Sequence, residues 1–369
     1  MPRVTVGLRS ALLWLGLVLA PLAAMAQSTS LPMAKPLPSP VAVPRLSGRL
    51  HAADVGLVIN TADPYSVAVG TYYMQLRKLA PAQVLRLELS RQAVISPDEF
   101  ETLRAAIAAH FGATTQALAL AWVEPYAVAC NSITGALALG FDAELCHSPC
   151  AASRLSPYFN SASSRPNRDL GLRPSMLLAA RDVAQARALI DRGVAADNTL
   201  GLLGALPVSA LFIETPDKAR NVRAPLFPPA GWVGATGRSG IVVERQFAAE
   251  LRPPPRVVLV QTGSARLEGL GSLDWVPGGL GDHLTSFGGM LADSQGQSNA
   301  LEWIAGGATA SYGTVSEPCS HPQKFPHPQV LLLNYLQGST AIEAYWKSVA
   351  WPQQGLFIGE PLAAPFARR

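Results

Sequence analysis

The chain has 369 residues, of which 49% are hydrophobic and 15% charged, so it can bury a substantial core in one large domain or two smaller ones. Its formal net charge of +4 is small and scattered. Without a basic stripe interleaved with aromatic residues, nucleic acid is excluded as an expected partner. The sequence contains no repeat and no Gly-x-Gly-x-x-Gly or phosphate-loop pattern, so no cofactor is expected.

The first 26 residues have the pattern of a cleaved secretory signal. Two arginines precede an apolar run from Ala11 to Leu22, and Ala24–Ala26 offers the small-x-small pattern of a signal-peptidase site. The apolar run is too short to cross a bilayer as a stable helix; the alternative is an uncleaved N-terminal anchor. Residues 27–50 are expected to form a flexible lead-in. No later stretch reaches spanning length, so we expect an exported protein of the periplasm or cell envelope, with no integral membrane segment after cleavage.

From residue 51 the chain alternates apolar runs of strand length with segments that begin at helix-capping residues. Asp63 and Pro64 supply an N-cap and a first-turn proline, and Ser96 and Glu99 form a capping box. In chain order, the first expected elements are strand Val55–Asn60, a helix ending near Leu79, strand Val84–Leu89, a helix stopped by Gly112, strand Ala117–Val123, a helix through Leu139, strand Met176–Ala180, a helix from Asp182 to Gly193 and strand Val208–Glu214. This alternation is typical of a parallel sheet covered by helices.

The second half of the chain continues the alternation after a proline-rich turn region. Its expected elements are strands Ile241–Val243, Val257–Gln261 and Leu273–Val276, helix Asn299–Ile304, strand Ala308–Thr314, helices Gln329–Leu336 and Thr340–Val349, and a final strand and turn over Leu356–Pro361. The sequence therefore predicts a single α/β domain over residues 51–365, with possible halves at 51–215 and 240–365. Its sheet is expected to be mostly parallel, with helices on both faces.

Four cysteines in an exported chain predict two disulfides. Of the three possible pairings, Cys146 with Cys150 would close a tight local loop and leave Cys130 to reach Cys319. A zinc site built from Cys146, His147 and Cys150 is the competing interpretation, although it lacks a regular second half.

Polar residues follow the strand Ala117–Val123, and open α/β sheets place ligands at the carboxyl ends of their strands. Glu124, Asn131 and Ser132 are therefore candidate binding residues. The alternative for Asn131 and Ser132 is that they only cap the following helix.

A glycine-rich stretch from Gly278 to Pro328 surrounds a polar cluster that we interpret as a loop. Asp282, His283 and Ser286 supply the residue types of a hydrolytic site: Ser286 as nucleophile, His283 as base, and Asp282 or Glu317 to orient the base. Triad members normally come from separate elements, so the alternative is a turn network in which these side chains satisfy their own backbone.

Metal binding is a further possibility at the same stretch. Asp282, His283, His321 and His327 are suitable ligand types, but their spacing matches no standard motif, so a solvated loop is favoured and no metal is predicted. Cys319 is not favoured as a nucleophile because disulfide pairing competes for it.

Several segments, among them DHLTSFGG, WIAGGATASYGTVSEP and CNSITGALALGFD, resemble a family of uncharacterised exported bacterial proteins, a resemblance that implies no established activity. The order of elements near the end of the chain also resembles that of gingipain-type cysteine peptidases, which implies a caspase-like or flavodoxin-like sheet. Their dyad is a His after one central strand and a Cys after the next. The corresponding segments here, 262–264 and 282–286, lack that His and that Cys.

The sequence therefore favours an envelope protein of one of two classes. The first is a non-canonical or degenerate peptidase-like hydrolase, and the second is a non-catalytic binding or structural module. Its expected partner is a peptide, a glycan or another envelope protein.

Overall fold

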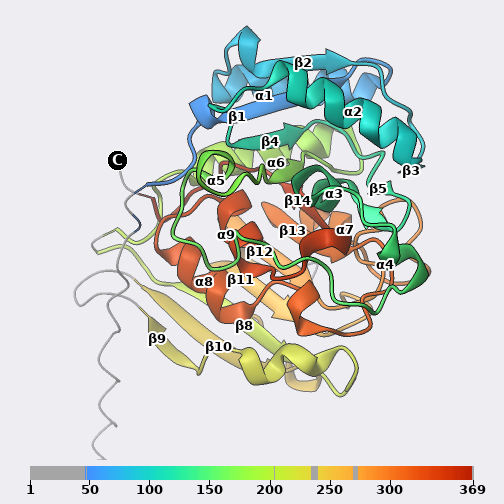
Figure 1. Ribbon diagram of the computed structural model, residues 1–369. Coiled ribbons are helices and arrows are strands. Elements are labelled where there is room, and N and C mark those ends of the chain that lie inside the picture. The colour runs from blue at the N-terminus through green and yellow to red at the C-terminus, as the bar shows by residue number, and fades with distance from the viewer. Residues whose placement is uncertain (1–45, 47, 203, 234–239, 269–272, 368–369) are drawn as a thin grey trace, which may run out of the picture. The chain divides into compact units, whose positions relative to one another are not determined.

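The computed structural model describes residues 46, 48–202, 204–233, 240–268 and 273–367 (Figure 1). The expected signal over residues 1–26 and nearly all of the lead-in lie outside the described residues. Among the helices that are described, none has both the length and the apolar composition needed to cross a bilayer.

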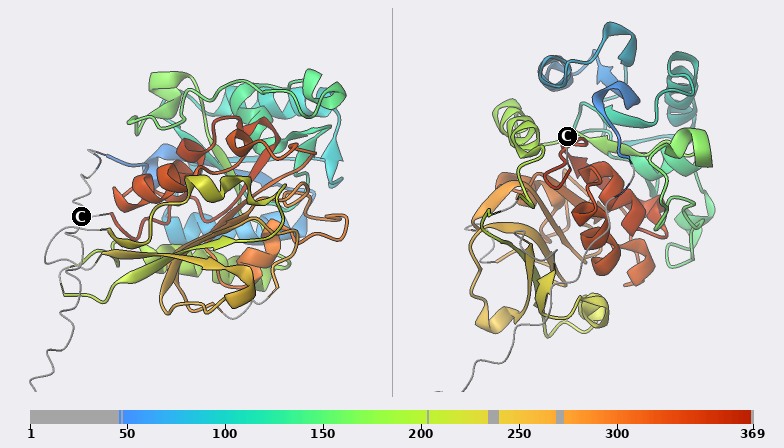
Figure 2. Two further views of the ribbon diagram at one scale, coloured as in Figure 1. Left: turned by 90° about the horizontal axis from the view of Figure 1, so that it is seen from below. Right: turned by 90° about the vertical axis from the view of Figure 1, so that its left-hand side faces the viewer.

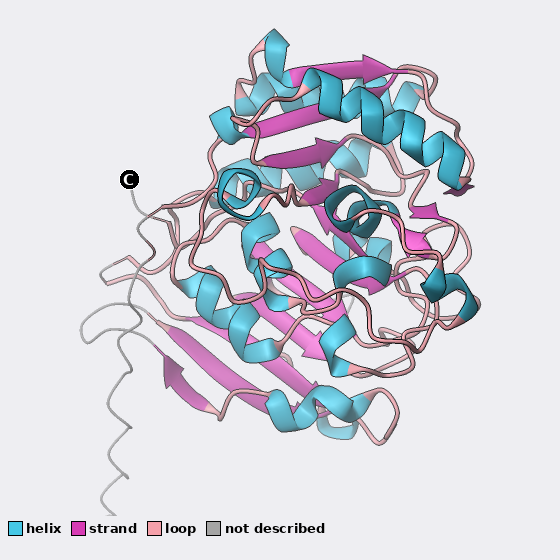
Figure 3. Cartoon of the chain, in the orientation of Figure 1, coloured by secondary structure: helices cyan, strands magenta, loops and turns pink. Residues whose placement is uncertain are grey.

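An eleven-stranded sheet forms the centre of the fold (Figure 3). In spatial order its strands are β2 (Val84–Leu87), β1 (Val55–Asn60), β4 (Ala117–Leu120), β7 (Ser175–Leu177), β14 (Gly355–Gly359), β13 (Ala310–Thr314), β12 (Trp275–His283), β11 (Val257–Thr262), β8 (Val208–Glu214), β10 (Ile241–Phe247) and β9 (Gly231–Val233). Parallel ladders join β2, β1, β4 and β7, and also β13, β12, β11, β8 and β10. Strand β14 is antiparallel to β13, and β9 is antiparallel to β10.

Helices cover both faces of the sheet, as the right-hand view in Figure 2 shows. On one face lie α1 (Pro64–Arg77), α6 (Val183–Ala196) and α7 (Ala300–Ala305); on the other lie α2 (Pro97–His110), α3 (Ile133–Leu139), α8 (Pro328–Leu336) and α9 (Ala341–Ser348). The prediction of an α/β fold with a mostly parallel sheet and covering helices is confirmed.

Shorter elements connect these layers. They are a three-stranded sheet of β3 (Val94–Ile95), β5 (Ala127–Val128) and β6 (Asn131–Ser132), helices α4 (Glu144–His147) and α5 (Pro166–Leu170), and 3₁₀ turns η1 (Ala52–Asp54), η2 (Pro81–Gln83), η3 (Asn221–Leu226), η4 (Ala248–Glu250), η5 (Pro322–Lys324) and η6 (Pro352–Gln354). The small sheet and β9 were not predicted, since two- and three-residue strands carry too few residues for a periodic pattern.

The predicted helix caps form as the sequence indicates. The Asp63 carboxylate accepts a hydrogen bond from the Tyr65 backbone N–H at 3.0 Å at the start of α1. Ser96 and Glu99 form the reciprocal capping box of α2. These caps fix where each helix begins, directly after the strand or turn that precedes it.

The two ends of β14 make different contacts. The Gly355 carbonyl, at its start, accepts a hydrogen bond from Ser132, which precedes α3 beyond the carboxyl end of β4. Glu360, just past its end, pairs with Arg77 at the end of α1. Besides its antiparallel ladder with β13, β14 pairs with β7 in parallel at a single residue pair, Ile358 with Leu177.

The main correction concerns β12. We predicted a strand over Leu273–Val276 followed by a polar loop, whereas β12 runs from Trp275 to His283 and is buried from Gly278 onward. Two of its glycines serve close packing: a Cβ atom on Gly279 would lie 2.4 Å from the Trp275 ring, and one on Gly281 would lie 2.5 Å from the Trp303 ring. Gly281 thus lets the α7 indole rest directly on the strand. Gly278 has a φ of +88°, which favours glycine.

Candidate functional site

Asp282 and His283 are consecutive residues of β12, so their side chains point to opposite faces of the sheet. Asp282 faces the side covered by η3 and η5, where it meets Arg223. His283 faces the side covered by α7, where it meets Trp303. The expected support of a His283 base by Asp282 is therefore wrong, because the strand separates the two groups.

Both ring nitrogens of His283 are used inside the core. The Trp303 indole N–H, which can only donate, lies 2.9 Å from His283 Nδ1, so Nδ1 is the acceptor and the proton is on Nε2. His283 Nε2 donates to the Ser298 carbonyl oxygen at 3.0 Å. Burial lowers the pKa of His283 to about 4, and the positive charges of Arg223 and Arg220 act in the same direction. The ring is a neutral structural group that has no lone pair left for a hydroxyl.

Asp282 belongs to a buried ion pair. Its carboxylate lies 2.6 Å from Arg223 Nη1 and 2.8 Å from Gln261 Nε2. Arg223 also donates to the carbonyl oxygens of Pro326 and Thr262, both at 3.1 Å. Burial raises the pKa of Asp282, while Arg223 and Gln261 oppose that shift. This network ties η3 to the end of β11 and β12.

Ser286 and Glu317 do not complete a catalytic site with His283. Ser286 is half-buried, and within the described residues its hydroxyl makes no hydrogen bond; its carbonyl oxygen accepts one from Thr314 Oγ1 at 2.8 Å. Glu317 accepts a hydrogen bond from the Cys319 backbone N–H instead. The structure thus assigns no partner to the proposed nucleophile.

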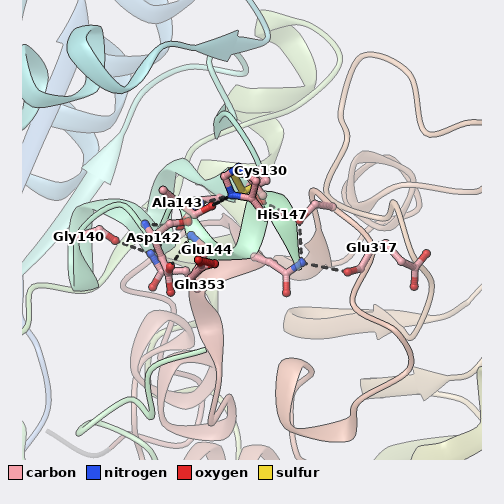
Figure 4. Close-up of a disulfide and its surroundings, with 12 residues drawn as sticks. Cys130, Gly140, Asp142, Ala143, Glu144, His147, Glu317 and Gln353 are labelled. Carbon is pink, nitrogen blue, oxygen red and sulfur yellow. Dashed lines mark hydrogen bonds between the residues drawn. A yellow bond between two sulfur atoms is a disulfide. The ribbon is translucent and has the colours of Figure 1, made fainter. Parts of the chain in front are cut away.

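Asn131 and Ser132 serve the backbone, as the capping alternative predicts. Ser132 caps α3 by accepting from the Gly135 N–H at 2.8 Å. The Asn131 side-chain amide donates to the Asp142 carbonyl oxygen, and its own oxygen accepts from the Asp142 N–H. The Gln353 side-chain amide also donates to the Asn131 oxygen; Gln353 and Asp142 are labelled in Figure 4. Both side chains are fully buried, so neither is available to a ligand in solution.

All four cysteines form disulfides, as predicted, but the favoured pairing is wrong. Cys130 pairs with Cys146 (Figure 4), and Cys150 pairs with Cys319. The helical turn of α4 holds Cys146 within 5.2 Å of Cys130, Cα to Cα. The Lys324 ammonium donates to the Pro149 carbonyl, which draws the next residue, Cys150, toward the loop that carries Cys319. Because Cys146 and Cys150 lie in different disulfides, the zinc alternative also fails.

The histidines considered as metal ligands have other contacts. His327 caps α8 through Nδ1, which accepts from the Val330 N–H, and His321 packs edge-on against Trp351. Throughout the described part of the chain, no three His, Cys, Asp or Glu residues are grouped closely enough to hold a metal ion.

A pocket of about 380 Å³ lies at the carboxyl edge of the sheet, beyond β1, β4 and β7. The chain leaves β1 toward β2 on one side and later enters β4 on the other, so β1 and β4 flank a topological switch point, where open α/β sheets place ligands. Its lining residues are Asp63, Tyr65, Arg91, Val123, Glu124, Ala180, Arg181, Leu291 and Leu301. Of the predicted binding residues, Glu124 alone lines this pocket.

Sequence reasoning missed the two arginines of this pocket. Arg91 follows β2 and Arg181 follows β7, each a few residues beyond its strand. Their position after strands that end at one edge was the available signal. Tyr65 forms part of the wall, because its hydroxyl donates to the Leu178 carbonyl at 3.0 Å and accepts from the Ala180 N–H at 2.8 Å.

The buried His283 predicts a pH-dependent stability. The unfolded chain binds a proton at this side chain below pH about 6.5, whereas the folded protein does so only near pH 4. The free energy of unfolding should therefore fall as pH drops, by about 2–3 kcal/mol between pH 7 and pH 4.5 from this residue alone. Urea unfolding of the protein and of His283→Gln at both pH values measures the difference. An equal pH dependence in the two proteins would contradict the assignment.

Comparison with family models and with curated proteins finds no match for this chain.

Proposed function

We propose that this chain is an exported, non-catalytic binding protein of the bacterial envelope, whose ligand occupies the pocket beyond β1, β4 and β7. The sheet is mostly parallel, and the resemblance to gingipain-type peptidases supports a caspase-like ancestry in which the catalytic residues were lost. The two disulfides are those of a protein that matures in an oxidising compartment.

The observation that carries this proposal is the environment of His283. A general base needs a free lone pair within hydrogen-bond reach of the proton it removes. Trp303 occupies the acceptor nitrogen of this ring, and the ring is fully buried on the α7 side of the sheet. A hydrolytic Ser286 would therefore lack its base.

The pocket supplies the positive part of the proposal. Its volume falls in the range of small-molecule sites, and it combines apolar walls with a few charged groups. Within the described residues, Arg91, Arg181 and Glu124 form no ion pair with one another or with any other side chain. Charged groups at a switch point that lack an ion-pair partner in the described part of the chain are suited to a polar ligand.

The test is covalent labelling of the purified mature protein with a fluorophosphonate probe, beside the Ser286→Ala variant and an active serine hydrolase as positive control. We expect no labelling of either form, and no cleavage of a broad peptide-substrate panel. Labelling that depends on Ser286 would overturn the proposal and establish the hydrolase alternative.

A further inference from the structure

We propose that the pocket beyond β1, β4 and β7 binds a small zwitterion with an apolar side chain: a free amino acid or a dipeptide. This inference rests on the proposed binding function and specifies its ligand. It follows from three features of the pocket, namely two guanidinium groups and one carboxylate that have no ion-pair partner among the described residues, and an apolar wall between them.

The guanidinium groups provide the anion-binding part. Arg91 and Arg181 are exposed side chains that approach the pocket from opposite sides, because β2 and β7 flank β1 and β4 in the sheet. Neither forms an ion pair or a hydrogen bond with another described residue. A guanidinium group presents a planar fork that matches a carboxylate, so this arrangement favours a ligand carboxylate over a neutral group.

Glu124 provides the cation-binding part. It follows β4 and so lies between the two arginines along the edge of the sheet. The other carboxylate of the pocket, Asp63, already caps α1 through Tyr65, whereas the half-buried Glu124 carboxylate accepts no hydrogen bond from described residues. A ligand ammonium group would give it a partner that the described residues do not supply.

The wall and the volume limit the rest of the ligand. Val123, Leu291, Leu301 and the fixed ring of Tyr65 offer apolar surface, which suits a branched aliphatic side chain. A pocket of about 380 Å³ has room for an amino acid or a dipeptide. Opposite charges at separate points of one small pocket match a molecule that carries both.

Isothermal titration calorimetry of the mature protein with L-leucine and with the dipeptide Ala-Leu tests the inference and distinguishes a free amino acid from a dipeptide as the ligand. We expect one of them to bind, and its N-acetylated and C-amidated forms to bind at least about tenfold more weakly. Glu124→Gln should abolish the effect of acetylation, and Arg91→Gln with Arg181→Gln should abolish the effect of amidation. Glu101→Gln, a surface carboxylate of α2, is the matched control and should bind like the parent protein.

The outcomes separate the ligand class from the function. Binding that is insensitive to both blocking groups, or to the pocket variants, overturns the zwitterion. Binding of inorganic phosphate or citrate that depends on Arg181, without binding of either zwitterion, also overturns it and leaves the binding function standing. Hydrolysis of the dipeptide would instead overturn the proposed function. Melting temperatures that no compound of a broad metabolite panel changes would overturn both.

Discussion

Replacing Arg223 by methionine should lower the free energy of unfolding by about 3–5 kcal/mol, because it leaves the Asp282 carboxylate buried without its counter-charge. The two side chains of this pair are 1% and 0% exposed, so water cannot take the place of the guanidinium group. Urea unfolding at pH 7 measures the loss. The large effect reflects an unpaired charge and not a large net contribution of the intact pair.

Two further variants test this explanation. Adding Asp282→Asn to Arg223→Met removes the stranded charge and should recover part of the lost stability, since Gln261 remains as a partner. The control is Arg104→Met, which breaks a pair with Glu101 whose side chains are 53% and 51% exposed, and it should cost at most about 1 kcal/mol. Equal losses at the two sites would contradict the role given to burial.

Removing the Cys150–Cys319 disulfide should destabilise the protein more than removing Cys130–Cys146. The first bond joins residues 169 apart in sequence and the second joins residues 16 apart. Loop-closure entropy in the unfolded chain then predicts losses of about 5 and about 3 kcal/mol. The measurement is urea unfolding of the paired serine variants, Cys150→Ser with Cys319→Ser and Cys130→Ser with Cys146→Ser. A reversed order would show that native contacts, and not chain entropy, dominate.

The sequence was sufficient to predict the alternation of elements because the central strands are continuous apolar runs. β1 and β8 have the predicted bounds, and the Asp63 and Ser96 caps lie where the sequence placed them. Parallel strands have such continuous apolar sequences when helices cover both of their faces, because every side chain is then buried. Strand β8 also shows the limit of the pattern: predicted with the first half of the chain, it pairs with β10 and β11 of the second.

Strand β12 could not be recognised from its sequence. Its residues Gly278–His283 combine glycines with charged side chains, a composition typical of loops. Gly279 and Gly281 are required by the Trp275 and Trp303 rings packed against them. Asp282 is tolerated because it pairs with Arg223, which lies 59 residues away in the sequence. Each of these causes is a tertiary contact, which local periodicity does not contain.

The candidate site was predicted in part for a similar reason. Glu124 was identified because its place after a strand is a local fact, and the structure puts it in the pocket. Arg91 and Arg181 were missed because the sheet order β2-β1-β4-β7, which brings the ends of β2 and β7 near the end of β4, is set by long-range strand pairing. The residues with the most suggestive chemistry, Asp282 and His283, proved to be core groups.

Strand β14 follows every other strand of the sheet in the sequence, yet it lies between β7 and β13 in the middle of the sheet. While a ribosome is still making the chain, both of these strands present an unpaired backbone edge. The part of the sheet that ends at β7 can join the part that begins at β13 only after Gly355–Gly359 has been synthesised. A nonsense or frameshift lesion shortly before Gly355 would therefore disable the early strands as completely as the late ones.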